Sequence, residues 1–121
     1  MSVFLTIPEA EVIYKGEHFF LIRDQYPVAP GHTLIISHEV RPDYFSLTEG
    51  EKEELTKMID KAKELVEMEY QPDAYNIGMN CGVAAGQTVM HFHCHLIPRY
   101  KGDMEDPRGG VRHCVAGKGY Y

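Results

Sequence analysis

The sequence contains no tryptophan, three cysteines and no long apolar run. Cys81, Cys94 and Cys114 are odd in number and lack C-x-x-C spacing, which argues against a disulfide framework and favours free thiols in a reducing compartment. No apolar run approaches membrane-spanning length, and the apolar start of the chain lacks the basic flank of a signal peptide. We therefore expect a soluble cytoplasmic protein that does not associate with membranes.

Positive charge is also scarce. The 12 Lys and Arg residues against 18 Asp and Glu give a net charge of −6, which argues against a broad nucleic-acid-binding surface. Five of the 12 basic residues follow residue 97, so any additional attraction for anions is expected there. The length of 121 residues predicts one domain over 1–121, in which the glycine-rich segment 98–121 is an irregular tail.

Apolar periodicity predicts an α+β fold with one long helix and a mainly antiparallel five-stranded sheet. Leu55, Met58, Ala62 and Val66 mark one face of the helix, which should begin near 48, because Thr48 and Glu51 have the spacing of a capping box. Residues 71–73, with a proline at 72, should end it. The expected strands cover residues 12–14, 19–22, 33–37, 74–80 and 88–97, and Pro98 should stop the last one.

The last of these segments alternates histidines with apolar residues. Side chains of a strand alternate between its two faces, so His91, His93 and His95 should share one face, roughly 6.5–7 Å apart. The other face should carry Met90, Phe92, Cys94 and Leu96 and pack on the helix. This pattern predicts a polar site on the face of the sheet opposite the helix.

Three neighbouring imidazoles favour nucleophilic chemistry on an anionic substrate. Imidazole changes charge near neutral pH, and crowding lowers the cost of keeping one ring neutral, which is the form that attacks phosphorus. A zinc site is the alternative, because H-x-H on a strand is also a metal-binding pattern. Against zinc, the strand contains no Asp or Glu, and Cys94 should point to the opposite face.

At His91-Phe92-His93-Cys94-His95-Leu96-Ile97 the chain resembles the histidine triad (HIT) family. The stretch from Gly86-Gln87-Thr88 to Pro98-Arg99 is similar to the branch that contains the fragile-histidine-triad and diadenosine polyphosphate hydrolases. Pro30-Gly31-His32-Thr33-Leu34-Ile35 also matches the family. The resemblance covers roughly residues 10–105.

This resemblance implies a histidine triad fold whose sheet extends across a homodimer. It also implies a nucleotide hydrolase that cleaves at the α-phosphate in two steps, through a nucleotidyl-histidine intermediate. The expected substrate is a dinucleoside polyphosphate, which would release a nucleoside monophosphate. No cofactor is needed for this chemistry, and a structural zinc is not expected because the family's N-terminal cysteine pair is absent.

The resemblance also assigns roles to individual residues. His93 is the expected nucleophile, His95 contacts the scissile phosphate or the leaving group, and His91 and His32 orient the other imidazoles. Asp24 should bind ribose hydroxyls. The resemblance also places Asn80, Gln87 and Thr88 in contact with phosphate. Separately, Arg99 follows the histidines and is a candidate for neutralising outer phosphates, with a solvated tail as the alternative.

Two further surfaces are candidates for substrate contact. Phe20, Ile22 and Leu34 are an apolar slot for a base or simply part of the core. The basic tail either neutralises outer phosphates or is a solvated segment, and Tyr120-Tyr121 either stacks on a base or docks on a partner subunit. Four other functions stay open: hydrolysis of nucleoside phosphoramidates, nucleotidyl transfer, nucleotide binding with little turnover, and zinc binding.

Overall fold

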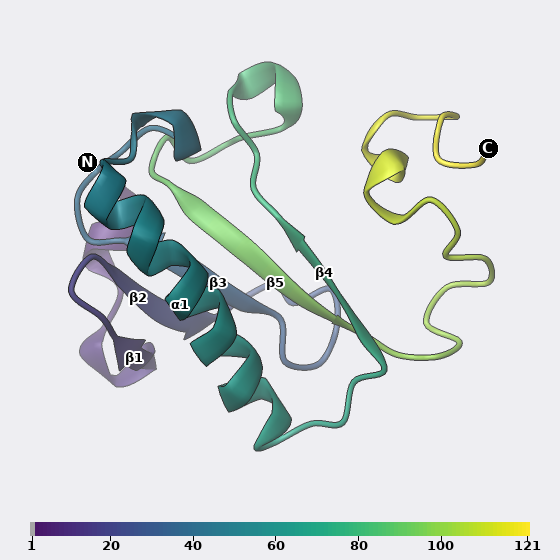
Figure 1. Cartoon of the computed structure of the whole chain (residues 1–121), viewed down its shortest axis with the longest axis horizontal. Coiled ribbons are helices and arrows are strands. Elements are labelled where there is room, and N and C mark those ends of the chain that lie inside the picture. The colour runs from purple at the N-terminus through teal and green to yellow at the C-terminus, as the bar shows by residue number, and fades with distance from the viewer. Residues whose placement is uncertain (1) are drawn as a thin grey trace.

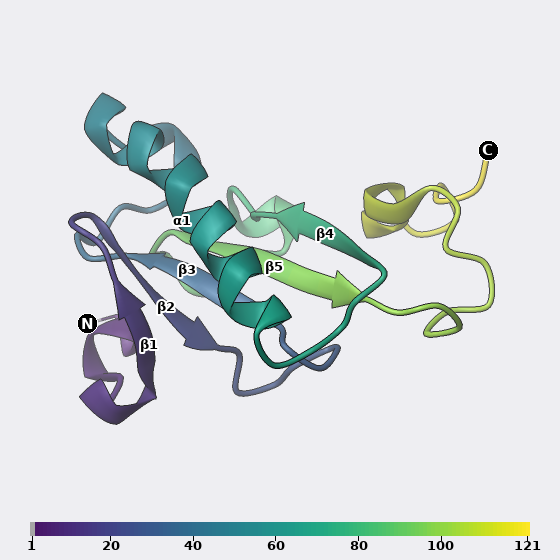
Figure 2. The same cartoon turned by 60° about the horizontal axis from the view of Figure 1, so that its bottom comes forward.

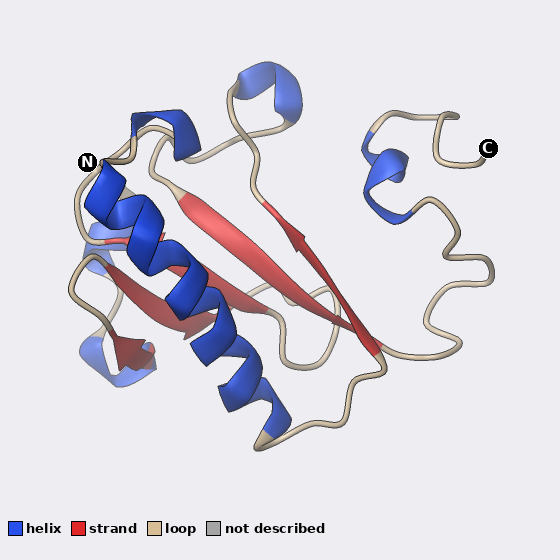
Figure 3. Cartoon of the chain, in the orientation of Figure 1, coloured by secondary structure: helices blue, strands red, loops and turns tan. Residues whose placement is uncertain are grey.

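A computed structural model describes residues 2–121, so Met1 of the expected domain lies outside the described residues. One antiparallel sheet carries the long helix α1, Glu49–Glu67, across one face (Figures 1 and 3). The strand order is β1-β2-β3-β5-β4, and every neighbouring pair is antiparallel, which confirms the α+β prediction. The strands are β1 Val12–Lys15, β2 Phe19–Arg23, β3 Thr33–Ser37, β4 Ala74–Gly78 and β5 His93–Arg99.

The helix begins where the capping box predicts. Thr48 Oγ1 accepts a hydrogen bond from Glu51 N at 3.1 Å, and Glu51 Oε1 accepts one from Thr48 N at 2.7 Å. The apolar stripe of the helix packs on β2, β3 and β5. This side of the sheet is a dry core that buries Leu55, Met58, Ala62 and Val66 from the helix and Phe19, Leu21, Ile35, Phe92, Cys94 and Leu96 from the sheet side.

The prediction for the last strand was wrong at both ends. The strand begins at His93 rather than residue 88, because Phe92 N bonds the Arg41 carbonyl and Gln87 Nε2 bonds the Pro42 carbonyl, at 2.6 Å each. These contacts draw residues 87–92 toward the turn before α1. As a result Met90 is exposed rather than packed on the helix. The strand also continues through Pro98, which lies beyond the part of β5 paired with β3, so its missing N–H costs no bond to that strand.

The opposite face of the sheet is covered by the start of the chain. Val3–Thr6 forms a single 3₁₀ turn, after which the chain leads through a second short turn into β1. Figure 2 shows this segment beside β1. Phe4 and Ile7 pack from it against a smaller apolar cluster on the sheet. That cluster consists of Phe20, Ile22, Leu34 and Ile36.

The tail after β5 contains one short 3₁₀ turn, Gly110–Cys114, and is otherwise irregular. It extends beyond the β4 side of the sheet (Figures 1 and 2), and the turn contacts β4. None of the helices in residues 2–121 combines the length and the apolar character that crossing a bilayer requires.

Candidate functional site

His93 and His95 are half-buried on the face of β5 opposite the helix, as the alternating pattern predicts, with ring centroids 5.4 Å apart. His93 Nδ1 lies 2.8 Å from the carbonyl oxygen of His91. A carbonyl oxygen only accepts, so Nδ1 carries the proton, and the neutral ring has its lone pair on Nε2. His93 is thus held in the tautomer that a nucleophile at Nε2 requires.

His91 lies just before β5 and is completely buried. Its Nε2 lies 2.6 Å from the carbonyl oxygen of Ser37 and must donate, so Nδ1 accepts from the Ser2 hydroxyl at 2.7 Å. Burial lowers the pKa of His91, the Ser37 carbonyl opposes that shift, and His93 adds to it. The side chain is therefore neutral, with both nitrogens engaged, and acts on the site through its carbonyl.

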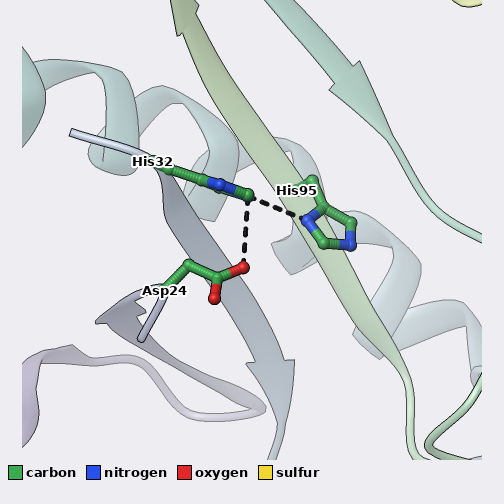
Figure 4. A group of neighbouring side chains, drawn as sticks. All are labelled: Asp24, His32 and His95. Carbon is green, nitrogen blue, oxygen red and sulfur yellow. Dashed lines mark hydrogen bonds and ion pairs between the residues drawn. The ribbon is translucent and has the colours of Figure 1, made fainter. Parts of the chain in front are cut away.

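His32, His95 and Asp24 form a second linked group (Figure 4). The Val28 amide donates to His32 Nδ1 at 3.1 Å, so the His32 proton is on Nε2. His32 Nε2 lies 2.9 Å from His95 Nδ1 and 3.4 Å from Asp24 Oδ2. Since His32 donates to Nδ1 of His95, the proton of the neutral His95 ring is on Nε2.

Burial is the main influence on the charge of this group. It lowers the pKa of His95 to about 4, with His93 and His32 adding to the shift and Asp24 opposing it. Burial also lowers the pKa of His32, again against the Asp24 carboxylate. Both rings are therefore neutral at pH 7, and His95 Nε2–H is a hydrogen-bond donor.

The loop before β3 places His32 because of a glycine. Gly31 has φ of +89°, in the left-handed region that side chains disfavour, and a Cβ there would lie 3.0 Å from the Tyr70 ring. The turn brings His32 to the start of β3, whose residue Leu34 is paired with His95. The Pro-Gly-His pattern thus has a direct geometric role.

A cavity of about 640 Å³ opens beside these histidines. Such a volume is typical of sites for small organic ligands. Its lining includes the apolar side chains of Phe4, Ile7, Ile22 and Leu34. It also includes polar side chains, those of His32, His93, His95, Asp24, Asn80 and Thr88.

Three of the five expected substrate contacts line this cavity: Asp24, Asn80 and Thr88. Gln87 does not, because its side chain is buried and binds Gly82 N, the Pro42 carbonyl and the Val89 carbonyl. Arg99 also lies outside the cavity wall, because its guanidinium binds Asp103 through two bonds of 2.8 Å and Asn76 through one of 2.6 Å. In this structure Gln87 shapes the loop, and Arg99 anchors the start of the tail.

The apolar slot and the tail also differ in part from expectation. Ile22 and Leu34 line the cavity, whereas Phe20 stacks on His38 with ring centroids 5.4 Å apart. In the tail, Arg108 lies 5.3 Å from the Tyr120 ring centre and Arg112 lies 5.0 Å from that of Tyr121. These basic and aromatic side chains pack on one another.

The N-terminal turn is the part of the site that sequence reasoning missed. Val3, Phe4, Thr6 and Ile7 line the cavity, and the Phe4 ring meets His91 and His93 edge-on at centroid distances of 5.4 and 4.9 Å. The signal for it in the sequence is the concentration of apolar residues before Pro8.

Asp24, His32 and His95 are also a possible metal-binding group, because one ligand atom of each lies within 4.8 Å of the others. A carboxylate and two imidazoles are suitable donors for Zn²⁺. In the structure these donors are instead hydrogen-bonded or paired with one another.

Comparison with known proteins agrees with this architecture. The model of the HIT domain family matches residues 7–102. The asymmetrical bis(5'-nucleosyl)-tetraphosphatase of Schizosaccharomyces pombe is 35% identical over 97 residues, which are 80% of this chain and 53% of that protein. AP-4-A phosphorylase of Mycobacterium tuberculosis is 30% identical over 100 residues, 82% of this chain and 51% of that protein. The chain thus spans about half the length of these curated relatives.

The solved structures lead to the same family. A HIT family protein from Bacillus anthracis superposes with a TM-score of 0.77 at 34% identity, over 84% of this chain and 75% of that one. Together with the family match over residues 7–102 and the histidines of β5, this likeness shows that the chain belongs to the HIT domain family of histidine triad proteins.

Proposed function

We propose that this chain is a nucleotide hydrolase that cleaves at the α-phosphate through a nucleotidyl-histidine intermediate on His93. The observation that carries the proposal is the 2.8 Å bond from His93 Nδ1 to the His91 carbonyl. It leaves the Nε2 lone pair of a neutral ring available at a cavity that is large enough for a nucleotide. The HIT relatives named as a tetraphosphatase and a phosphorylase support the same class of substrate.

In the first step, His93 Nε2 forms a bond to the α-phosphorus. The bond from that phosphorus to the bridging oxygen breaks, and its electron pair leaves on the departing phosphate. The His93 ring becomes a cation, and the His91 carbonyl stabilises it by accepting from Nδ1–H. In the second step water attacks the phosphorus, the electron pair of the P–N bond returns to Nε2, and one proton of the water passes to solvent.

His95 favours a phosphate rather than an amine as the leaving group. Its Nε2–H can donate a hydrogen bond to the departing oxygen, but with a pKa of about 4 it holds no second proton at pH 7. A phosphate departs as an anion and needs only that hydrogen bond, whereas the amine of a phosphoramidate must be protonated as it leaves. We therefore place dinucleoside polyphosphates ahead of phosphoramidates, with a nucleoside monophosphate as the product.

The cavity offers separate surfaces for the parts of such a substrate. The base would lie against Phe4, Ile22 and Leu34, and its ribose hydroxyls would reach Asp24. The α-phosphate would then lie near Asn80 and Thr88. Gln87 and Arg99 are not needed as direct contacts in this arrangement.

The test is AMP release from diadenosine tetraphosphate and from an adenosine phosphoramidate, in excess chelator. We expect the tetraphosphate to be cleaved in preference to the phosphoramidate, and His93→Ala to abolish cleavage. His18→Ala is the matched control, because this histidine lies outside the cavity wall. Preferential phosphoramidate cleavage would overturn the leaving-group argument, and no cleavage of either substrate would overturn hydrolysis itself.

Two alternatives to hydrolysis, nucleotidyl transfer and nucleotide binding with little turnover, predict different results. The relative from Mycobacterium tuberculosis is named a phosphorylase, so phosphate can replace water as the second nucleophile in that protein. Adding inorganic phosphate would then yield ADP in place of AMP. In a binding module with little turnover, the nucleotidyl protein would fail to accumulate when radiolabelled nucleotide is mixed with excess protein.

We also propose that the chemistry needs no metal. The donors of Asp24, His32 and His95 are already paired with one another, and a metal would have to displace those bonds. Activity that persists in chelator would support this. Activity lost in chelator and restored by Zn²⁺, with one zinc per chain by elemental analysis, would favour the zinc-binding alternative.

The expected homodimer is likewise a proposal. β4 is an edge strand, where Ile77 is 47% exposed, and an unpaired edge is a template for another strand. The nearby turn of the tail adds Val111, which is 64% exposed. Light scattering should give twice the chain mass, and Ile77→Lys should shift that mass toward the monomer.

A further inference from the structure

The Ser2 hydroxyl connects the N-terminal turn to the triad. Its oxygen accepts a hydrogen bond from Phe4 N at 3.2 Å, which caps the 3₁₀ turn, and lies 2.7 Å from His91 Nδ1. Because the Ser37 carbonyl already fixes the His91 proton on Nε2, the serine hydroxyl must donate to Nδ1. One side chain thus satisfies the turn and completes the hydrogen bonding of a buried histidine.

The position of His91 affects the orientation and the tautomer of the His93 ring. His91 contacts the neighbouring ring through its backbone carbonyl, which accepts from His93 Nδ1. A shift of His91 would lengthen that bond and release His93 to rotate or to change tautomer. His91 precedes β5, and its position is held by the Phe92 N–H bond to the Arg41 carbonyl on the next peptide and by the side-chain bonds of His91 to Ser2 and Ser37.

The same turn also packs directly on His93. Phe4 lies two residues after Ser2 and presents its ring edge-on to His91 and His93. The ring covers part of the cavity wall, so its position affects how much water reaches the imidazole. Ser2 therefore reaches His93 in two ways, through the His91 carbonyl and through Phe4.

We propose that Ser2 is a positioning residue for the reaction, whose hydroxyl holds His91 and Phe4 so that His93 presents Nε2 to the α-phosphate. This inference rests on the proposed function for its kinetic consequence but not for its structural one. It predicts that loss of the hydroxyl reduces the chemical step more than substrate binding, because Phe4 is the one expected base contact on the turn that Ser2 caps, whereas Ile22, Leu34 and Asp24 lie on other segments.

The test compares Ser2→Ala with Ser2→Thr, in protein produced without an N-terminal extension. We expect Ser2→Ala to lower kcat about tenfold, the effect of losing one buried hydrogen bond, with KM changed less than about twofold. Ser2→Thr keeps the hydroxyl and should recover most of kcat. Thr56→Ala is the matched control, because it removes a hydroxyl that only binds the Glu53 carbonyl on the exposed helix surface.

A second readout is the nitrogen spectrum of the imidazole rings, recorded by NMR with no substrate. In wild type we expect His91 protonated on Nε2 and His93 on Nδ1. In Ser2→Ala the His91 Nδ1 resonance should move to higher chemical shift as its donor is lost, and His93 should show a mixture of tautomers. If Ser2 only supported the cavity wall, Ser2→Ala would instead raise KM and leave the spectra of His91 and His93 unchanged.

The two readouts separate this inference from the proposed function. If wild type releases no AMP but the spectra change as described, the hydrolase proposal fails and the positioning role of Ser2 stands. If wild type is active and Ser2→Ala matches it in both kcat and spectra, the positioning role is overturned. The same holds if His91 in wild type is protonated on Nδ1.

Discussion

The two faces of β5 differ in what burial does for the molecule. On the helix side, Cys94 and Leu96, with Phe92 just before the strand, are at most 1% exposed and meet only the dry core. On the other side, His93 and His95 are half-buried and line a cavity. The alternation of a single strand thus separates a surface that stabilises the fold from one that is free to carry chemistry.

The strongest test of this division removes the expected nucleophile. His93→Gly should reduce AMP release by at least about 10³-fold, because the first step then has no nucleophile. The melting temperature should stay within a few degrees of wild type, since the ring is half-buried and its loss opens space toward the cavity. A variant that unfolds, or one that keeps most of its activity, would contradict the separation of roles. Circular dichroism and the AMP assay are sufficient measurements.

The matched change on the other face is Leu96→Ala. It removes a side chain that is 1% exposed and packed under α1, so the free energy of unfolding should fall by roughly 2–5 kcal/mol. At a temperature where the variant is still folded, kcat should stay within about threefold of wild type. Urea denaturation measures the first effect and the AMP assay the second. Large loss of kcat without loss of stability would mean that the faces are not independent.

Most of the fold was predictable because its signals are local. The capping box at Thr48 and Glu51, the apolar stripe of α1 and the alternation of β5 each depend on residues a few positions apart. Of the three histidines expected on one face, His93 and His95 lie there, whereas His91 precedes the strand and is buried outside the cavity wall. The family resemblance then added the assignment of His32, 63 residues from its partner His95, which periodicity alone does not provide.

The errors arose where distant contacts decide the structure. Residues 88–92 were expected to be strand, but Gln87 and Phe92 bind carbonyls of residues 41 and 42, and no short-range pattern indicates those bonds. Arg99 was expected to meet phosphate, and in the structure its guanidinium binds Asn76, 23 residues earlier in the chain, as well as Asp103. Ser2 is 89 residues from His91, so its bond to the triad could not be derived from spacing.

The pH dependence of stability is a smaller test of the histidine face. The pKa of His95 is about 4 in the folded chain and ordinarily 6.5, so between these values the unfolded chain binds the additional proton. The free energy of unfolding should therefore fall as the pH is lowered from about 7 to 4, with a contribution from His95 on the order of 1–2 kcal/mol after solvent screening. The lowered pKa values of His32 and His91 act with the same sign.

His95→Gln isolates this contribution, because glutamine is polar but does not titrate. Urea denaturation at a series of pH values should give a shallower decline for His95→Gln than for wild type. His18→Ala serves as the control for removing a histidine that lies outside the cavity wall. Parallel curves for His95→Gln and wild type would show that His95 titrates normally in the folded chain.

The smallest effect is expected for Cys94, which is adjacent to His95 and lies on the other face of β5. Burial raises the pKa of the Cys94 thiol to about 12, so at pH 8 only about one molecule in 10⁴ holds the reactive thiolate. Alkylation followed by mass spectrometry should label the exposed Cys114 and leave Cys94 unmodified until the chain is unfolded. Labelling of Cys94 in the native protein would show that the core opens on the timescale of the reaction.

The comparison of Cys94 with His95 shows that one physical cause has two chemical consequences. Desolvation disfavours the charged form of each residue, so it raises the pKa of the thiol and lowers that of the imidazole. A neutral thiol is a poor nucleophile, so burial makes Cys94 unreactive. A neutral imidazole keeps one lone pair and one N–H, so the same burial leaves His95 able to accept from His32 and to donate into the cavity. The labelling and pH experiments therefore test a single claim about burial from opposite faces of β5.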